Sequence, residues 1–118
     1  MQLTSLPPSP PARLADAAQE AAERIVLHWL ALNGNQVTVT APSPGTHHIH
    51  AVGKDNRLIR ILGAVLPLEP VFLRDTEAQH MAGEAGRAGA QAWEVRVQLN
   101  RQLHAIWIRW RRLLANAS

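Results

Sequence analysis

Three closely spaced histidines are the residues best suited to metal chemistry. His47, His48 and His50 lie within one short segment, and neutral imidazole is a common zinc ligand. On an extended strand, successive side chains point to opposite faces, so only His48 and His50 share one. A catalytic zinc needs a third protein ligand. The other histidines of the chain are His28, His80 and His104. A histidine pair on a solvated strand face is the simpler interpretation, and we predict neither a bound metal nor a cofactor.

Arginine and tryptophan gather at the end of the chain, a combination typical of nucleic-acid and protein interfaces. From residue 91 onward there are five arginines and a single acid. A guanidinium binds phosphate, and an exposed indole stacks on bases or fills a pocket of a partner. We predict a nucleic-acid site, with DNA rather than RNA as its ligand. Its residues are Arg96, Trp107, Arg109, Arg111 and Arg112.

Other reaction classes find no support in the sequence. The chain has no cysteine, which excludes a disulfide framework, a thiolate zinc site and a cysteine nucleophile. None of its four serines, Ser5, Ser9, Ser43 and Ser118, lies in a nucleophile-elbow motif. Three glycines, Gly83, Gly86 and Gly89, lie in an alanine-rich helical pattern and not in a phosphate-binding loop. We therefore expect no catalysis.

Length and composition are those of one small soluble domain. The chain has 118 residues, of which 47% are hydrophobic and 18% charged. No apolar run approaches the ~20 residues of a membrane-spanning helix, and no basic segment with a following apolar run suggests a secretory signal. We expect a cytoplasmic protein that does not bind membranes. The net charge of +3, with eleven arginines and one lysine, is also ordinary for such a domain.

The N-terminal part predicts an arm and a helix. Residues 1–11 contain four prolines, which favour extended backbone, so we expect a loose arm followed by a single domain over residues 12–118. Apolar residues then recur at steps of three and four, which indicates an amphipathic helix ended by Asn33 and Gly34. The expected buried stripe is Leu14, Ala18, Ala21, Ile25, Trp29 and Leu32.

The rest of the chain predicts strands around a second helix. Residues 37–40 alternate as a strand, and the runs 46–52 and 58–65 form a hairpin about the turn 53–56. A helix then begins at Asp75 or Thr76, either of which can cap it. Residues 93–99 alternate between apolar and polar side chains, which indicates a strand with one buried and one polar face. Residues 103–110 form the last strand.

These elements predict an α/β (α+β) domain of order αβββαββ, with a mixed sheet of about five strands flanked by two helices. If Val95 and Val97 point inward, then Arg96, Trp107 and Arg109 lie on the opposite face. The residues that accompany them there are Thr38, Thr40, His48, His50 and, less firmly placed by the pattern, Arg60. We expect Trp29, Trp93 and Trp110 in the core, and Trp107 at the surface or an interface.

The order of elements resembles the core of the PD-(D/E)xK nuclease superfamily, which includes restriction endonucleases and archaeal-type Holliday-junction resolvases. Segment 48–64 is similar to the family's catalytic hairpin in length, turn placement and apolar pattern. The resemblance implies a metal-binding aspartate, a second carboxylate and a lysine at three positions, which here hold His48, Leu62 and Ala64. Leucine and alanine cannot bind Mg²⁺ or activate water. A member with these residues cannot use the family's mechanism.

Two functions follow from this combination. The first is a non-catalytic, nuclease-like domain, a pseudoenzyme, that binds nucleic acid through its basic, tryptophan-containing last strand. The alternative is a protein-assembly module, either a homodimer or a subunit of a larger complex, that uses the Trp107 face or an exposed strand edge.

Overall fold

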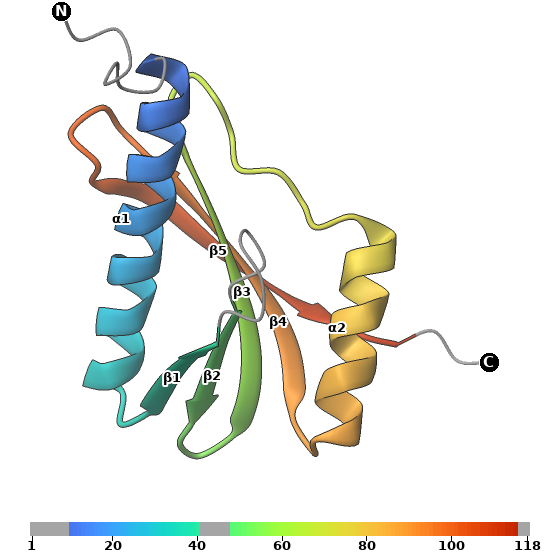
Figure 1. Ribbon diagram of the computed structural model, residues 1–118. Coiled ribbons are helices and arrows are strands. Elements are labelled where there is room, and N and C mark those ends of the chain that lie inside the picture. Colours follow the sequence, from blue (N-terminus) through green and yellow to red (C-terminus); the bar gives the residue numbers. More distant parts are fainter. Residues whose placement is uncertain (1–9, 41–47, 116–118) are drawn as a thin grey trace, which may run out of the picture.

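The computed structural model describes residues 10–40 and 48–115, which form two helices and a five-stranded sheet (Figure 1). The elements are α1 (Pro10–Leu32), β1 (Gln36–Thr40), β2 (His48–Val52), β3 (Asn56–Val65), α2 (Asp75–Arg87), β4 (Gln91–Leu99) and β5 (Ala105–Leu113). The sheet order is β1-β2-β3-β4-β5. Only β3 and β4 are parallel, and the other neighbouring pairs are antiparallel. The predicted α+β class, element order and mixed sheet are confirmed.

Helix α1 packs closely on one face of the sheet because small residues line the contact. Ala18 and Ala22 are buried there against β3. A Cβ atom added to Gly63 of β3 would lie 2.5 Å from the Ala22 Cβ atom and 2.8 Å from the Ala18 carbonyl oxygen. Glycine at this position therefore allows the approach of helix and strand. Val95 and Val97 of β4 complete this core.

The buried stripe of α1 is rotated from the predicted one. Val26 and Leu30 are buried, whereas Trp29 is 45% and Leu32 72% exposed. Trp29 was expected in the core but lies outside it. The residues of α1 that face the sheet are instead Ala22, Val26 and Leu30. The helix also begins at Pro10, inside the expected arm, since proline lacks only a hydrogen bond that the first turn does not make. It ends as predicted, with Gly34 at φ 81°.

Helix α2 covers part of the opposite face. Its buried residues Ala78, Met81, Ala82 and Ala85 pack with Ala92 of β4 and Leu113 of β5. The expected cap at Asp75 or Thr76 is not formed. Arg74 occupies the N-cap position instead, and no side-chain hydrogen bond caps the helix in the described part of the chain. Acidic residues in the first turn interact favourably with the helix dipole all the same.

Strand β3 extends beyond its hairpin partner, and a side chain of α1 takes the partner's place. The β2–β3 register ends at the pair Ile49 and Ile59. Past that point, Gln19 Nε2 donates to the Ile61 carbonyl at 2.7 Å, and the Gly63 amide donates to Gln19 Oε1 at 3.1 Å. One amide side chain therefore pairs with β3 much as a neighbouring strand would.

Neither described helix is long and apolar enough to span a membrane.

Candidate nucleic-acid interface

The pairing of β4 with β5 brings the predicted basic residues together. Arg96 lies opposite Arg109, and Gln98 lies opposite Trp107. Cross-strand partners in an antiparallel pair share one face. The pair Ala92 and Leu113 belongs to the cluster around α2, and every second residue from there shares its face. Arg96, Trp107, Arg109 and Arg111 therefore lie on the face of the sheet against which α2 packs.

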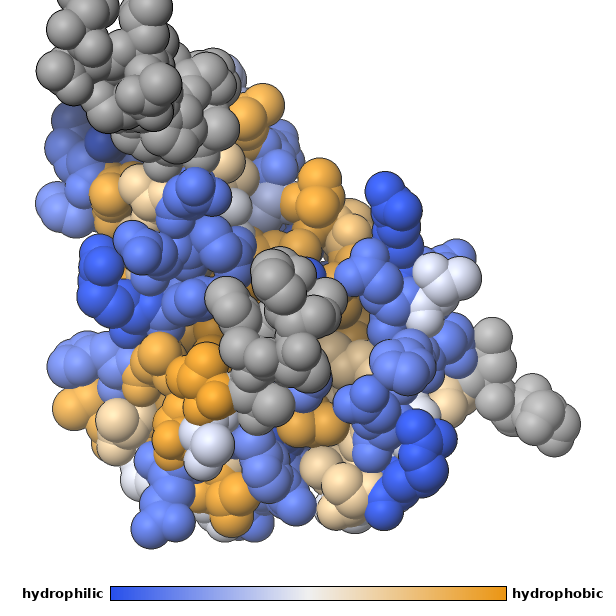
Figure 2. All heavy atoms as spheres, viewed as in Figure 1, coloured by the Kyte–Doolittle hydropathy of each residue, from blue (hydrophilic) through white to orange (hydrophobic). Residues whose placement is uncertain are grey.

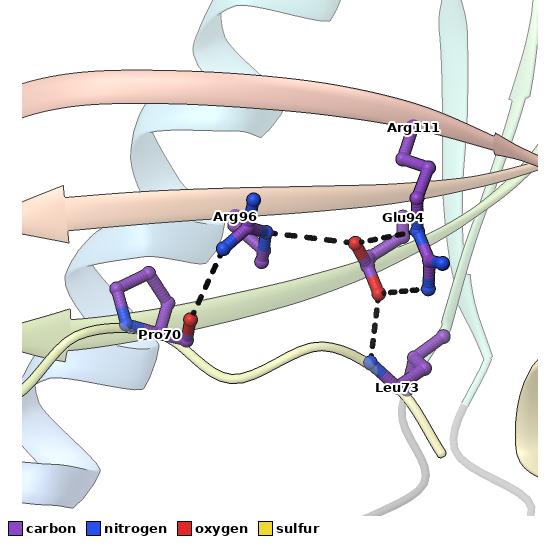
Figure 3. Close-up of polar contacts among 5 residues, drawn as sticks. All are labelled: Pro70, Leu73, Glu94, Arg96 and Arg111. Atoms are coloured by element: carbon purple, nitrogen blue, oxygen red, sulfur yellow. Dashed lines mark hydrogen bonds and ion pairs between the residues drawn. The ribbon is translucent and has the colours of Figure 1, made fainter. Parts of the chain in front are cut away.

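A buried carboxylate, which sequence reasoning did not single out, organises this face. Glu94 is fully buried and accepts hydrogen bonds from Arg111 Nε at 3.1 Å and Arg111 Nη2 at 2.8 Å. The Leu73 amide donates to the same carboxylate at 2.7 Å, and Arg96 Nε lies 3.6 Å from it. Figure 3 shows Glu94 between the two guanidinium groups and the backbone of Leu73. The carboxylate joins two strands to the segment that precedes α2.

The face of β4 that the alternation indicated as polar is therefore also largely buried. Gln98 is also buried, and its Nε2 donates to the carbonyls of Ala64 at 3.1 Å and Leu68 at 2.9 Å. Segment 66–74 covers this face, and its backbone carbonyls and amides partner the polar side chains beneath it. Alternation in a sequence reports which face a residue takes, but not whether a distant segment covers that face.

Guanidinium groups and aromatic rings alternate across the site. The Arg96 guanidinium carbon lies 3.7 Å from the centre of the Phe72 ring, and that of Arg111 lies 5.0 Å from the same ring. Arg109 lies 4.2 Å and Arg96 5.5 Å from the Trp107 ring. Such cation–π contacts hold each guanidinium plane in place. We call these five residues the arginine row, and they follow one another in the order Arg111, Phe72, Arg96, Trp107, Arg109.

The row carries more positive charge than its carboxylate neutralises. Arg96 and Arg111 share the single charge of Glu94. Arg109 is exposed and makes no ion pair with any described residue. The Arg111 side chain is 43% exposed although it is held by Glu94, whereas Arg96 is 12% exposed. Among the three arginines of this row, Arg109 and Arg111 are therefore more accessible to an anion than Arg96.

Four of the five predicted residues meet at this site, and Arg112 does not. Arg112 pairs with Trp93 of β4, so it lies on the α1 side of the sheet. Trp107 is half-buried, with Arg109 over its ring. The ring thus helps to orient a guanidinium, and part of the surface on which a base would stack is already occupied. Phe72 belongs to the row but was not predicted, because nothing near it in the sequence indicates a contact with β4.

The other tryptophans lie on the α1 side. Trp110 packs against Trp29 of α1, with ring centres 5.4 Å apart, and against Trp93 at 6.2 Å. Trp93 and Trp110 are partly buried against the core, close to the expectation. Trp29 reaches the same cluster from the exposed side of its helix.

The histidine pair lies on β2, away from the arginine row. His48 pairs with Thr40 of β1 and His50 with Thr38. Nε2 of His50 is hydrogen-bonded to Oδ1 of Asn56, so one ring nitrogen already has a partner. The described residues contain no group of three metal-binding side chains. His47 lies outside the described residues.

An apolar groove lies beside two of the three positions that the nuclease resemblance singled out. Leu62 and Ala64 of β3 lie along it, with Leu14 of α1 and segment 68–71 on its other sides. Its volume is about 710 Å³. Figure 2 shows hydrophobic side chains along segment 66–74 and between that segment and α1. The donors that Mg²⁺ chemistry requires are absent at Leu62 and Ala64.

Comparison with known proteins assigns no family. No family model matches the chain, and neither the curated proteins nor the solved structures contain a significant match.

Proposed function

We propose that this protein binds nucleic acid without catalysis, through the sugar–phosphate backbone, and that the arginine row on β4 and β5 makes the contact. The observation that supports this most is the exposed Arg109, which is held over Trp107 and has no ion-pair partner among the described residues. A guanidinium fixed in this way keeps its N–H groups free to bind two phosphate oxygens at once.

Contacts to phosphate, rather than to bases, follow from how the aromatic rings are used. Phe72 and Trp107 both carry guanidinium groups over their rings. Backbone contacts fix the position of a nucleic acid but do not read its sequence. We therefore expect binding with little base preference. DNA remains the ligand we propose, and the resemblance of the element order to the nuclease core belongs to this proposal as well.

Salt dependence provides the test. The full chain would be titrated into fluorescein-labelled single-stranded and duplex DNA of scrambled sequence, and anisotropy would be followed at several salt concentrations. Neutralising two phosphates releases counterions, so we expect the logarithm of the affinity to fall with a slope of about −2 against the logarithm of salt concentration on duplex DNA. Affinity that does not change with salt, or no saturable binding at low salt, contradicts the proposal.

A protein-assembly role is the second candidate, and the exposed side chains of β5 favour it. Ile106 and Ile108 are 48% and 38% exposed on an edge strand, a location where strands of other chains can pair. The partner is either a second copy of the chain, which gives a homodimer, or another protein of a larger complex. Light scattering over a range of protein concentrations distinguishes a dimer from a monomer.

A further inference from the structure

The outer edge of β5 is unpaired in the described part of the chain. β5 is nine residues long and pairs with β4 on one side only. An edge strand leaves the amide and carbonyl groups of alternate residues without a partner in the sheet. These groups are a template for one more strand, supplied by an extended peptide.

The two faces beside this edge differ in character. On the α1 side, Ile108 lies next to Trp110, and Trp29 extends the apolar surface from the helix. On the α2 side, Arg109 and Arg111 alternate with these apolar residues. Over residues 108–111 the edge is therefore apolar on one face and basic on the other, and Arg112 ends the apolar face.

A second copy of this chain fits the edge poorly. Two β5 strands paired antiparallel about Arg109 would place this arginine opposite itself, and like charges directly opposite one another destabilise a strand pair. Charged side chains on edge strands are a common means of preventing self-pairing. The same charges favour an acidic strand.

We propose that the β5 edge binds an extended segment of a partner protein in which acidic and apolar residues alternate. Residues opposite Arg109 and Arg111 would be aspartate or glutamate, and residues opposite Ile108 and Trp110 would be apolar. Period-two alternation places the two sets on opposite faces of the added strand. Backbone hydrogen bonds then supply affinity, and the two rows of side chains supply specificity.

Peptide binding at this edge and the proposed nucleic-acid binding are two different activities that use some of the same residues. An acidic strand would contact the same guanidinium groups as a phosphate backbone, so the two ligands exclude one another. The apolar row at Ile108 and Trp29 serves the peptide alone. A substitution in that row can therefore distinguish the two activities.

The test uses the full chain and a fluorescein-labelled peptide of nine residues, the length of β5, in which glutamate and valine alternate. A peptide of the same composition, with all glutamates before all valines, has the same charge and is the control. We expect the alternating peptide to bind about tenfold more tightly, a difference of about 1.4 kcal/mol. Bound peptide would also slow hydrogen exchange at the amides of β5.

Two variants complete the design. Ile108→Glu places an acid in the apolar row and is expected to abolish the preference for the alternating peptide, while oligonucleotide binding remains. Val39→Glu, at an exposed position on β1, which is the opposite edge of the sheet from β5, is the matched control and should bind both ligands as the wild type does. Circular dichroism verifies that each variant is folded.

Three outcomes overturn the proposal. The first is equal binding of the two peptides, because charge alone would then explain the attraction. The second is no binding of the alternating peptide at millimolar concentration. The third is unchanged hydrogen exchange in β5 on saturation with peptide, since added-strand pairing must protect the edge amides.

Discussion

Glu94 of β4 and Arg111 of β5 lie directly opposite each other, and two hydrogen bonds, of 2.8 and 3.1 Å, join the buried carboxylate to the guanidinium. The same carboxylate holds the backbone of Leu73. It therefore couples the segment before α2 to the strand that carries the exposed arginines. The shape of the proposed binding surface therefore depends on the carboxylate of Glu94, which is buried beneath it.

Glu94→Gln should strongly destabilise the fold. The substitution keeps the size of the side chain but removes the charge that Arg96 and Arg111 share, and breaking a buried ion pair costs about 3–5 kcal/mol. Urea denaturation measures the loss. Glu84→Gln is the control, because its partner His80 is largely exposed and an exposed pair contributes at most about 1 kcal/mol. Equal stabilities of the two variants would contradict this role for Glu94.

Arg109→Gln should weaken DNA binding and flatten its salt dependence, whereas Arg112→Gln should do neither. Loss of one phosphate contact reduces the slope on duplex DNA by about 0.9. Both residues are arginines near the end of β5, but they lie on opposite faces of the sheet. Both substitutions remove one positive charge, so a difference between them reports the position of the arginine on the sheet and not the net charge of the chain. Equal effects of the two substitutions would indicate non-specific attraction to a basic chain end.

Gly63→Ala should destabilise the contact of α1 with β3. The new methyl group would approach the Ala22 Cβ atom and the Ala18 carbonyl oxygen too closely, and overpacking of this kind costs about 1–3 kcal/mol. Adding Ala22→Gly to the same chain should restore part of the thermal stability. Gly86→Ala provides the control, since a Cβ atom there meets nothing within 4 Å and alanine favours the helix. It should leave stability unchanged or raise it.

Gln19→Leu should leave backbone groups at the edge of β3 without their hydrogen-bond partners. The variant loses both hydrogen bonds to Ile61 and Gly63 and leaves backbone groups without partners, at a cost of about 1–3 kcal/mol. Hydrogen exchange at the Gly63 amide should accelerate. Glu20→Gln, at an exposed position on the same helix, should leave that exchange rate as it is. An unchanged rate in the Gln19 variant would show that water replaces the side chain without loss.

Protein purified without a histidine tag should contain less than one equivalent of zinc. His48 and His50 lack a third ligand among the described residues, and an H-x-H pair alone does not complete a zinc site. Elemental analysis measures the metal content directly. A stoichiometric metal that is lost in His48→Ala would instead support a site at this pair.

Local patterns predicted the elements and the faces of the sheet, because both depend on residues near one another in the sequence. The alternation in residues 93–99 correctly placed Val95 and Arg96 on opposite faces. It could not indicate that Glu94 is buried, since the covering segment 66–74 is distant in the sequence and has no regular pattern. The stripe of α1 was misplaced for a different reason. Two adjacent rows of that helix are apolar, and the packing against distant strands, including the close contact of Ala18 and Ala22 with Gly63, selects between them.

The pairing of Gln19 with β3 bears on how the chain avoids aggregation. Exposed strand edges recruit other chains, and the far half of β3 would be such an edge if α1 were detached. Synthesis proceeds from the N-terminus, and the early parts of a chain can fold first. The helix that shields β3 therefore leaves the ribosome before the strand does. A nascent chain carries its own protection against misassembly by the time the vulnerable edge appears.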